Sequence, residues 1–282
     1  MTTTALKNIR FGHSPDPDDA FMFYAIAKNK IDMRGFQVGH VIEDIETLNQ
    51  RALLNAELEV TAVSCHAYAY LTDKYIAMRS GASVGNKYGP MIISHKAKKK
   101  DGNIKGKKVA IPGKMTTAYL AVQIYEKDFI PVFIPFDKIF DAVESGEVEY
   151  GLIIHEGQLT YQDKGFEKIV DLGVWWFEKT GRPLPLGLDV IRRDLGMETI
   201  RAFSALFKDS IQYALDHRSP ALDYALEYGR GLSKNLGDRF VGMYVNEDTV
   251  NLSRESEEGL RMLLEEGAKK GLIPSSPRIE FV

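Results

Sequence analysis

Strand-like and helix-like segments alternate along most of the chain, and this alternation restricts the possible folds more than any other feature. In the first part, strands rich in β-branched residues at 36–42 and 59–64 flank a helix at 44–56, whose apolar side chains recur near the helical period. A short strand at 9–12 and a helix at 20–28 precede them. This order predicts an α/β fold, with a largely parallel sheet flanked by helices.

A second part of the chain repeats the pattern. Its elements alternate in the same way and are expected as strands at 107–111, 132–135 and 149–154, with helices at 118–127 and 137–145. The glycine at position 146 suits the end of the second of these helices. The sequence therefore predicts two small doubly wound units in tandem, each with a mixed, largely parallel sheet.

Two extended segments, 88–94 and 183–191, connect the halves, and both contain glycine and proline. Beyond residue 197 the sequence is almost entirely helical and has few strands with which to build a sheet of its own. We therefore expect a two-lobed clamshell with two crossover strands. Residues 1–92 and 189–282 would form lobe 1, with the helical tail, and residues 93–188 would form an inserted lobe 2.

Composition limits the kinds of binding partner and the cellular compartment that we expect for this protein. The net charge of −3 and the short basic run at 96–100, interpreted as a solvated turn, predict no nucleic-acid partner. The single cysteine, Cys65, excludes an intrachain disulfide and fits a reducing compartment. The first ten residues lack a signal-like apolar stretch, and no run reaches the roughly 20 apolar residues of a membrane span. We expect a cytoplasmic protein with no membrane partner, although a mature chain cloned without its signal would look the same.

Four predicted strand ends lead directly into predicted helices. Each of these strand ends is a turn that contains polar side chains, and the four turns lie at 13–19, 64–66, 113–117 and 155–158. Ligands of open parallel sheets bind beyond the carboxyl ends of the strands. Helix N-termini there attract anions such as carboxylates, so a small anionic ligand is predicted.

Candidate residues at these ends each have a structural alternative. Ser64, Thr116 and Thr117 have hydroxyl groups that could bind a carboxylate, or they could simply cap helices. His155 directly follows an apolar strand, where a helix N-terminus would keep its imidazole neutral and able to accept a proton. A hydrogen-bonded structural histidine is the alternative reading. No pair of histidines or acidic residues has a metal-ligand spacing, so no metal site is predicted.

Four segments together resemble the 1,4-dihydroxy-6-naphthoate synthase family of the futalosine route to menaquinone. They span residues 13–21, 63–64, 112–120 and 151–161, and the last contains the family-specific run His-Glu-Gly-Gln-Leu-Thr-Tyr. The resemblance extends from about residue 9 to residue 195. Many members read Ser-Pro-Cys-Pro-Asn-Asp where this chain has aspartate at positions 16 and 18. Either Asp16 points outward or Asp18 caps the helix.

The resemblance implies a fold similar to type II periplasmic solute-binding proteins. It also implies a carbon–carbon lyase that converts cyclic dehypoxanthine futalosine to 1,4-dihydroxy-6-naphthoate, with aromatisation driving the reaction and no cofactor required. His155 matches the family's proton acceptor. The implied substrate-binding residues are Ala62, Val63, Ser64, Thr116, Thr117 and Asp19.

Two other functions fit the same sequence. A chorismate dehydratase of the same pathway would share the fold, and so would a non-catalytic solute-binding protein for a small anion. In each case the partner is a small carboxylate, and the protein would be a monomer or a homodimer.

Overall fold

The computed structural model describes residues 7–98, 102–229 and 231–282, so the first six residues and Lys99 and Lys100 of the basic run lie outside it. The chain forms two compact units. Unit 1 comprises Met1–Val84, Gly187–Arg254 and Pro277–Val282, and unit 2 comprises Gly85–Leu186 and Glu255–Ser276. Each unit has its own mixed sheet flanked by helices, as the α/β prediction requires.

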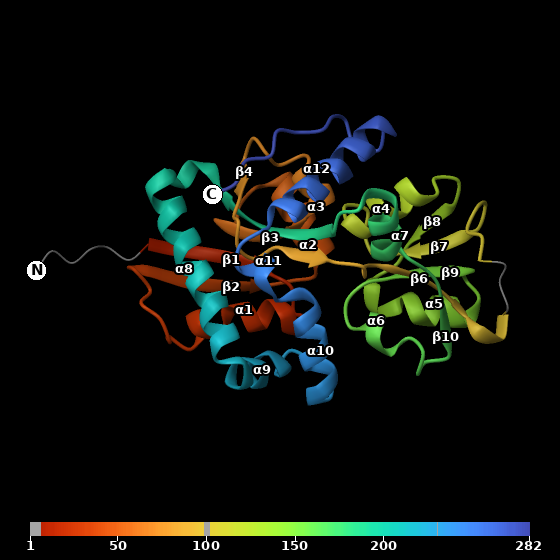
Figure 1. Ribbon diagram of the computed structural model, residues 1–282, viewed down its shortest axis with the longest axis horizontal. Helices are drawn as coiled ribbons and strands as arrows, with labels where there is room; N and C mark the ends of the chain where they lie inside the picture. Colours follow the sequence, from red (N-terminus) through yellow and green to blue (C-terminus); the bar gives the residue numbers. More distant parts are fainter. Residues whose placement is uncertain (1–6, 99–101, 230) are drawn as a thin grey trace, which may run out of the picture. The chain divides into compact units, whose positions relative to one another are not determined.

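The sheet of unit 1 combines a parallel core with antiparallel strands (Figure 1). Strand β1 pairs in parallel with β2 and β3, while β11 pairs antiparallel with β3 and β4. A short further strand, β5, pairs with β11. The bounds are β1 Lys7–His13, β2 Phe36–Ile42, β3 Val60–Ser64, β4 Tyr75–Ala77, β5 Ser83–Gly85 and β11 Leu184–Arg192. Parallel strands bring the carboxyl ends of β1 and β3 to one sheet edge, as predicted.

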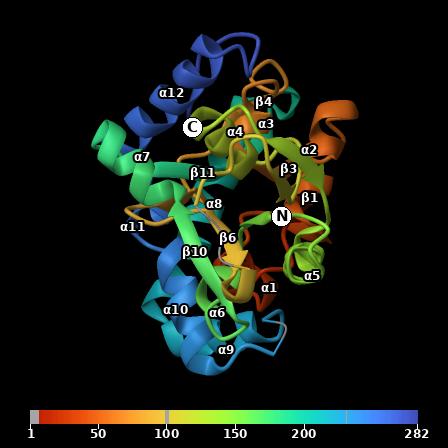
Figure 2. The ribbon, with the colours of Figure 1, turned by 90° about the vertical axis from the view of Figure 1, so that its right-hand side faces the viewer.

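Helices cover both faces of this sheet. On one face, α1 packs against α8, α9 and α10 (Figures 1 and 2). The ring of Phe11 contacts Phe23 of α1 and Phe203 and Phe207 of α8. On the other face α2 packs so closely on β1 that a Cβ at Gly12 would lie 2.8 Å from the side chain of Leu48. The helices are α1 Pro17–Ala27, α2 Ile45–Leu54, α3 Cys65–Tyr68, α8 Met197–Asp216, α9 Arg218–Leu226, α10 Lys234–Tyr244 and α11 Glu247–Val250.

The sheet of unit 2 has the order β10-β6-β9-β7-β8. Strand β7 pairs in parallel with β8 and β9, and β6 pairs antiparallel with β9 and β10. The bounds are β6 Met91–His95, β7 Lys108–Ile111, β8 Ile130–Phe133, β9 Tyr150–Ile153 and β10 Phe166–Asp171. Because β7 and β9 are parallel neighbours, the turns after them lie at the same edge of the sheet.

Helices of unit 2 pack on this sheet and on each other. Helix α5 contacts β6, β7 and β9, and α4 contacts α7. The helices are α4 Thr117–Tyr125, α5 Ile139–Ser145, α6 Gly157–Thr160, α7 Leu172–Thr180 and α12 Arg254–Lys269, with 3-10 turns η1 Lys96–Lys98 and η2 Phe136–Lys138. Within the described part of the chain, no helix combines the length and the apolar character needed to cross a membrane.

The C-terminal helix corrects the predicted division of the chain. The sequence placed the whole helical tail in lobe 1, but residues Glu255–Ser276 belong to unit 2. Helix α12 lies so close to the segment after α7 that a Cβ at Gly259 would be 2.4 Å from the carbonyl oxygen of Pro183. Two ion pairs, Lys179–Glu266 at 3.0 Å and Arg182–Glu258 at 2.8 Å, add to this packing.

Candidate active site

The turn after β1 is folded around its aspartates. Ser14 donates its backbone N–H to Asp19 Oδ2 at 2.7 Å and its hydroxyl to Asp16 Oδ2 at 2.8 Å. Asp16 is the N-cap residue of α1 and is buried, yet its side chain makes no capping bond. Both expectations for this turn are therefore wrong, because Asp16 points inward and Asp18 does not cap the helix. Asp19, an expected substrate-binding residue, helps to hold the turn.

Asp18 lies in the first turn of α1 with one buried carboxylate oxygen, Oδ1, that accepts no hydrogen bond from the described residues. Burial raises the pKa of Asp18 well above its ordinary value, and the negative charges of Asp19 and Asp16 raise it further. The carboxyl group is thereby favoured in its neutral form, which limits the negative charge that this turn presents to an anion.

His13, which is buried at the end of β1, pairs with the half-buried His40 of β2. His13 Nδ1 lies 2.9 Å from the carbonyl oxygen of Ser14, and its Nε2 lies 3.0 Å from His40 Nδ1. Because a carbonyl only accepts, Nδ1 of His13 carries the proton and its Nε2 accepts from His40. The His13 ring stacks on Phe23 at 4.4 Å. Burial lowers the pKa of each histidine to about 4, so both are neutral at pH 7.

The end of β3 contains the expected binding segment 62–64. Val63 is in the core, Ala62 is half-buried, and Ser64 is held on both sides by Asn49 of α2. Ser64 donates its N–H to Asn49 Oδ1 at 2.8 Å, and its hydroxyl oxygen accepts from Asn49 Nδ2 at 3.0 Å. The backbone N–H of Ser64 is thus engaged inside unit 1, which leaves its hydroxyl proton as the donor for a ligand. The following helix, α3, is only four residues long.

Asp189 of β11 is a candidate that sequence reasoning missed. It lies opposite Ala62 in the antiparallel pair and is only 2% exposed. Burial raises its pKa well above the ordinary value, and the negative charge of Asp19 raises it further. The signal in the sequence was an acidic residue within the apolar run Leu188 to Ile191, which was interpreted only as a crossover strand.

Thr116 and Thr117 begin α4 in unit 2, and both are buried. The Thr116 hydroxyl accepts from Tyr119 N at 3.2 Å and donates to the carbonyl oxygen of Gly113 at 2.9 Å, so Thr116 caps the helix. The Thr117 hydroxyl donates to the carbonyl oxygen of Leu186. Both hydroxyl protons therefore have acceptors within unit 2. First-turn N–H groups have no acceptor within a helix, and in α4 the Thr116 cap already accepts from that of Tyr119.

His155 follows β9 after Ile154 and is half-buried. Its backbone has φ of 63°, a left-handed conformation that is uncommon outside glycine and that often occurs at functional sites. Its ring lies 4.6 Å from that of Phe136, at an interplanar angle of 62°. The helix that follows, α6, has only four residues, so the predicted effect of a helix dipole on His155 has little basis.

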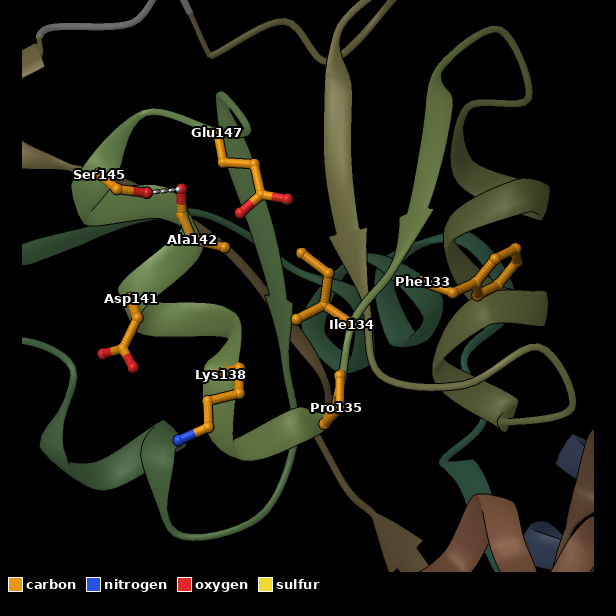
Figure 3. A pocket seen from close by; sticks show the side chains of 8 residues that line it. All are labelled: Phe133, Ile134, Pro135, Lys138, Asp141, Ala142, Ser145 and Glu147. Carbon is orange, nitrogen blue, oxygen red and sulfur yellow. Dashed lines mark hydrogen bonds between the residues drawn. The ribbon is translucent and has the colours of Figure 1, made fainter.

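A hollow of about 310 Å³ is lined by residues between Phe133 and Glu147, which precede His155 in the chain. Figure 3 shows Ile134 and Pro135 facing side chains of α5, including Ala142, with the carboxylate of Glu147 above them. None of the expected site residues lines the hollow. Pro135, which lines the hollow, precedes Phe136, whose ring contacts that of His155.

The structure therefore brings the expected residues together in two groups. In unit 1, Asp19, Ala62 and Ser64 follow or end parallel neighbouring strands, and Asp189 joins them from β11. In unit 2, Thr116, Thr117 and His155 follow the parallel neighbours β7 and β9.

Comparisons with known proteins agree with the resemblance noted in the sequence. The sequence model of a family described as "Menaquinone biosynthesis" matches residues 9–269. A Thermus thermophilus protein named 1,4-dihydroxy-6-naphthoate synthase is 40% identical over 98% of this chain and 100% of its own length. Residues 195–269 of the helical tail, beyond the resemblance seen by motif, are therefore covered as well.

Two solved structures are similar to this one. A crystal structure of an Archaeoglobus fulgidus protein has a TM-score of 0.90 and 47% identity, covering 94% of this chain and 98% of that chain. The alkanesulfonate-binding protein SsuA of Xanthomonas axonopodis has a TM-score of 0.72 and 12% identity, covering 98% and 96%. The second likeness concerns the fold alone and confirms the predicted periplasmic-binding-protein-like class.

Proposed function

The chain belongs to the menaquinone biosynthesis family, and we propose that within it the protein is a 1,4-dihydroxy-6-naphthoate synthase. It would act as a carbon–carbon lyase on cyclic dehypoxanthine futalosine. The observation that carries this proposal is the 40% identity, over 98% of the chain, to a relative of that name. The cytoplasmic compartment expected from the sequence stays a prediction.

His155 is the proton acceptor in this proposal. Its imidazole removes a proton from the substrate, a carbon–carbon bond breaks to release the ribose-derived fragment, and the remaining ring becomes aromatic. Three observations support this role: the left-handed backbone at His155, its half-buried ring against Phe136, and its position at the same sheet edge as the start of α4. A backbone strain of this kind costs free energy, and function is a common reason for it.

The carboxylate of the substrate binds at the first turn of α4. Because the hydroxyl protons of Thr116 and Thr117 already have acceptors and Tyr119 N donates to the Thr116 hydroxyl, the backbone N–H of Ala118 is the donor in that turn. Thr116 and Thr117 then act by fixing the turn, which refines the role that the family resemblance gives them. Asp19 and the segment 62–64 stay predicted substrate-binding residues of unit 1.

A turnover assay with two substrates tests the proposal. Purified protein is incubated separately with cyclic dehypoxanthine futalosine and with chorismate, and the products are followed by absorbance and mass spectrometry. Formation of 1,4-dihydroxy-6-naphthoate from the first substrate supports the proposal. Turnover of chorismate alone would indicate the dehydratase, and binding without turnover would indicate a solute-binding protein.

The variant that tests His155 is His155→Asn, because asparagine tolerates a left-handed backbone better than alanine does. Loss of a general base lowers kcat by about 10²–10⁴-fold, while substrate binding persists. His95→Asn is the matched control, since His95 also lies in unit 2 with its ring edge-on to a phenylalanine, Phe166, at 5.2 Å. Wild-type turnover in His155→Asn would remove His155 from the reaction.

A further inference from the structure

Asp189 lies beside the segment expected to bind substrate in unit 1. It is directly opposite Ala62 in the β3–β11 pair, and opposite residues of an antiparallel pair project from the same face of the sheet. Its neighbours along the strand, Leu188, Val190 and Ile191, are at most 1% exposed. On its own face of the sheet, the carboxyl group of Asp189 has Ala62 as its cross-strand neighbour and lies near the ring of Phe207.

The carboxyl group of Asp189 has no structural role among the described residues. Its side chain makes no hydrogen bond or ion pair within residues 7–98, 102–229 and 231–282. Asp171 of unit 2 shows the contrast: it is 7% exposed, and its side chain accepts from Gly173 N at 3.0 Å and from Val174 N at 3.2 Å as the N-cap of α7. A buried polar group without a partner is costly, and a ligand would supply the partner that Asp189 lacks.

The surrounding chain makes room for this carboxyl group. Gly81 has φ of 91°, and a Cβ there would lie 2.1 Å from Asp189 Oδ2 and 2.6 Å from the ring of Phe207. The backbone N–H of Gly81 donates to the carbonyl oxygen of Thr249 at 2.7 Å, which fixes its position. Any side chain at position 81 would displace the carboxyl group. The glycine at this position is therefore needed for the observed position of the Asp189 carboxyl group.

The charged group that acts electrostatically on Asp189 is Asp19, at the start of α1. Strand β3 presents Ala62, α8 presents Phe207, and the segment after β4 presents Gly81, and none of these side chains titrates. Burial and the Asp19 charge raise the pKa of Asp189 well above its ordinary value, so the protonated side chain persists to higher pH than in an exposed aspartate. A protonated carboxyl is a hydrogen-bond donor and does not repel an anion.

We propose that Asp189 contacts the substrate in unit 1 as a neutral carboxylic acid and donates a hydrogen bond to one of its oxygen atoms. The acceptor is a hydroxyl, carbonyl or carboxylate oxygen of the anionic substrate. No proton is transferred in this contact, so the role is one of binding and specificity. The inference rests on the proposed function for the identity of the substrate, but not on the role of His155.

The experiment measures KM and kcat for cyclic dehypoxanthine futalosine between pH 6 and pH 9 in three variants. Asp189→Ala removes the donor and should raise KM about 10-fold, with a smaller change in kcat. Asp189→Asn keeps a donor of the same shape and should retain a KM near that of the wild type. In the wild type KM should rise with pH as Asp189 loses its proton, and in Asp189→Asn this rise should be absent.

Asp171→Asn is the matched control, because Asp171 is also a buried aspartate with a raised pKa, and it lies in unit 2. It should change stability without altering the pH dependence of KM. An unchanged KM in Asp189→Ala, or an identical pH dependence in Asp189→Asn and wild type, would overturn the inference. If Asp189→Ala fails to fold, as judged by circular dichroism, the inference is tested by the pH dependence of KM in Asp189→Asn compared with that of the wild type.

The same data separate this inference from the proposed function. A wild-type protein that does not convert cyclic dehypoxanthine futalosine would refute the proposed function. A wild-type protein that converts it, with Asp189 variants that bind as the wild type does, would refute only the role of Asp189. Substrate binding to His155→Asn, measured by calorimetry, provides the affinity without turnover.

Discussion

Units 1 and 2 use the same frame of parallel neighbouring strands but treat polar groups at the strand ends differently. In unit 1, titratable groups are buried or half-buried near the end of β1 and within β11: the His13–His40 pair and the carboxyls of Asp18 and Asp189. In unit 2 the corresponding turns satisfy polar side chains with backbone groups, as Thr116 and Asp171 do. The comparison shows that the shared strand topology determines where a binding site can form. The burial of individual side chains determines which groups in each unit have shifted pKa values.

The largest expected effect is the acid sensitivity of unit 1. A buried histidine with a pKa lowered from 6.5 to about 4 binds fewer protons when folded than when unfolded between these pH values. The free energy of unfolding should therefore fall as pH falls through this window, by about 3 kcal/mol from His13 alone. Denaturant unfolding of wild type and His13→Asn at pH 7 and pH 4 measures it. The variant should show a smaller fall, and equal falls in both proteins would contradict the assignment.

The carboxyls of unit 1 act in the opposite direction. A raised pKa in the folded state means that the unfolded chain loses its proton first as pH rises, so these groups lower stability above their ordinary pKa. Asp189→Asn should therefore gain stability relative to wild type as pH increases from 5 to 8. This sign distinguishes the aspartates from the histidine pair within one unit.

The next effect concerns Asn49, which holds Ser64 with two buried hydrogen bonds. Asn49→Ala leaves the N–H of Ser64 unsatisfied and should lower the free energy of unfolding by roughly 2–3 kcal/mol. It should also raise KM if Ser64 binds substrate. Asn55→Ala is the control, because Asn55 is exposed at the C-terminal end of the same helix, α2. Equal stability of the two variants would show that the Asn49–Ser64 contact contributes little.

A smaller effect is expected for the cap of α4 in unit 2. Thr116→Val keeps the shape of the side chain but removes its bonds to Tyr119 N and Gly113 O, and should cost about 1 kcal/mol. Thr116→Ser retains the hydroxyl and should be close to wild type in thermal unfolding. If the valine and serine variants bind substrate equally well, the threonine hydroxyl serves the helix and not the ligand.

The smallest effect is expected for the ion pairs that join α12 to unit 2. Lys179 and Glu266 are 37% and 26% exposed, so their pair should contribute less than about 1 kcal/mol. A double-mutant cycle with Lys179→Met and Glu266→Gln measures the interaction, which should shrink in high salt. A larger, salt-independent value would mean that this pair, rather than apolar packing, secures α12.

Several features were predictable because their causes lie within a few residues along the chain. The sequence pattern located the strands β1, β2, β3, β7, β8 and β9 and the helices α1, α2, α4 and α5. The glycine at position 146 ends α5 in the left-handed conformation typical of a helix C-terminus. Position 155 was identified by its place directly after an apolar strand and by its family-specific neighbours.

Other features depend on residues that are distant in sequence. Helix α10 falls in the tail expected to be helical, but its packing against α1 and α9, with Phe240, Val241 and Tyr244 buried, could not be derived from the local pattern. The assignment of α12 to the wrong unit has the same cause, because its partners, Pro183 and Lys179, lie far earlier in the chain.

The sequence by itself determined the α/β class, the strand ends that carry polar residues, and the family. Only the tertiary structure decided which of those polar groups are buried and how they are paired. Asp189 lies opposite Ala62, and His13 meets His40, because strand pairing brings them together, and no local pattern encodes that pairing. Burial in turn sets their protonation, since a low-dielectric surrounding disfavours charge on any group that lacks a partner.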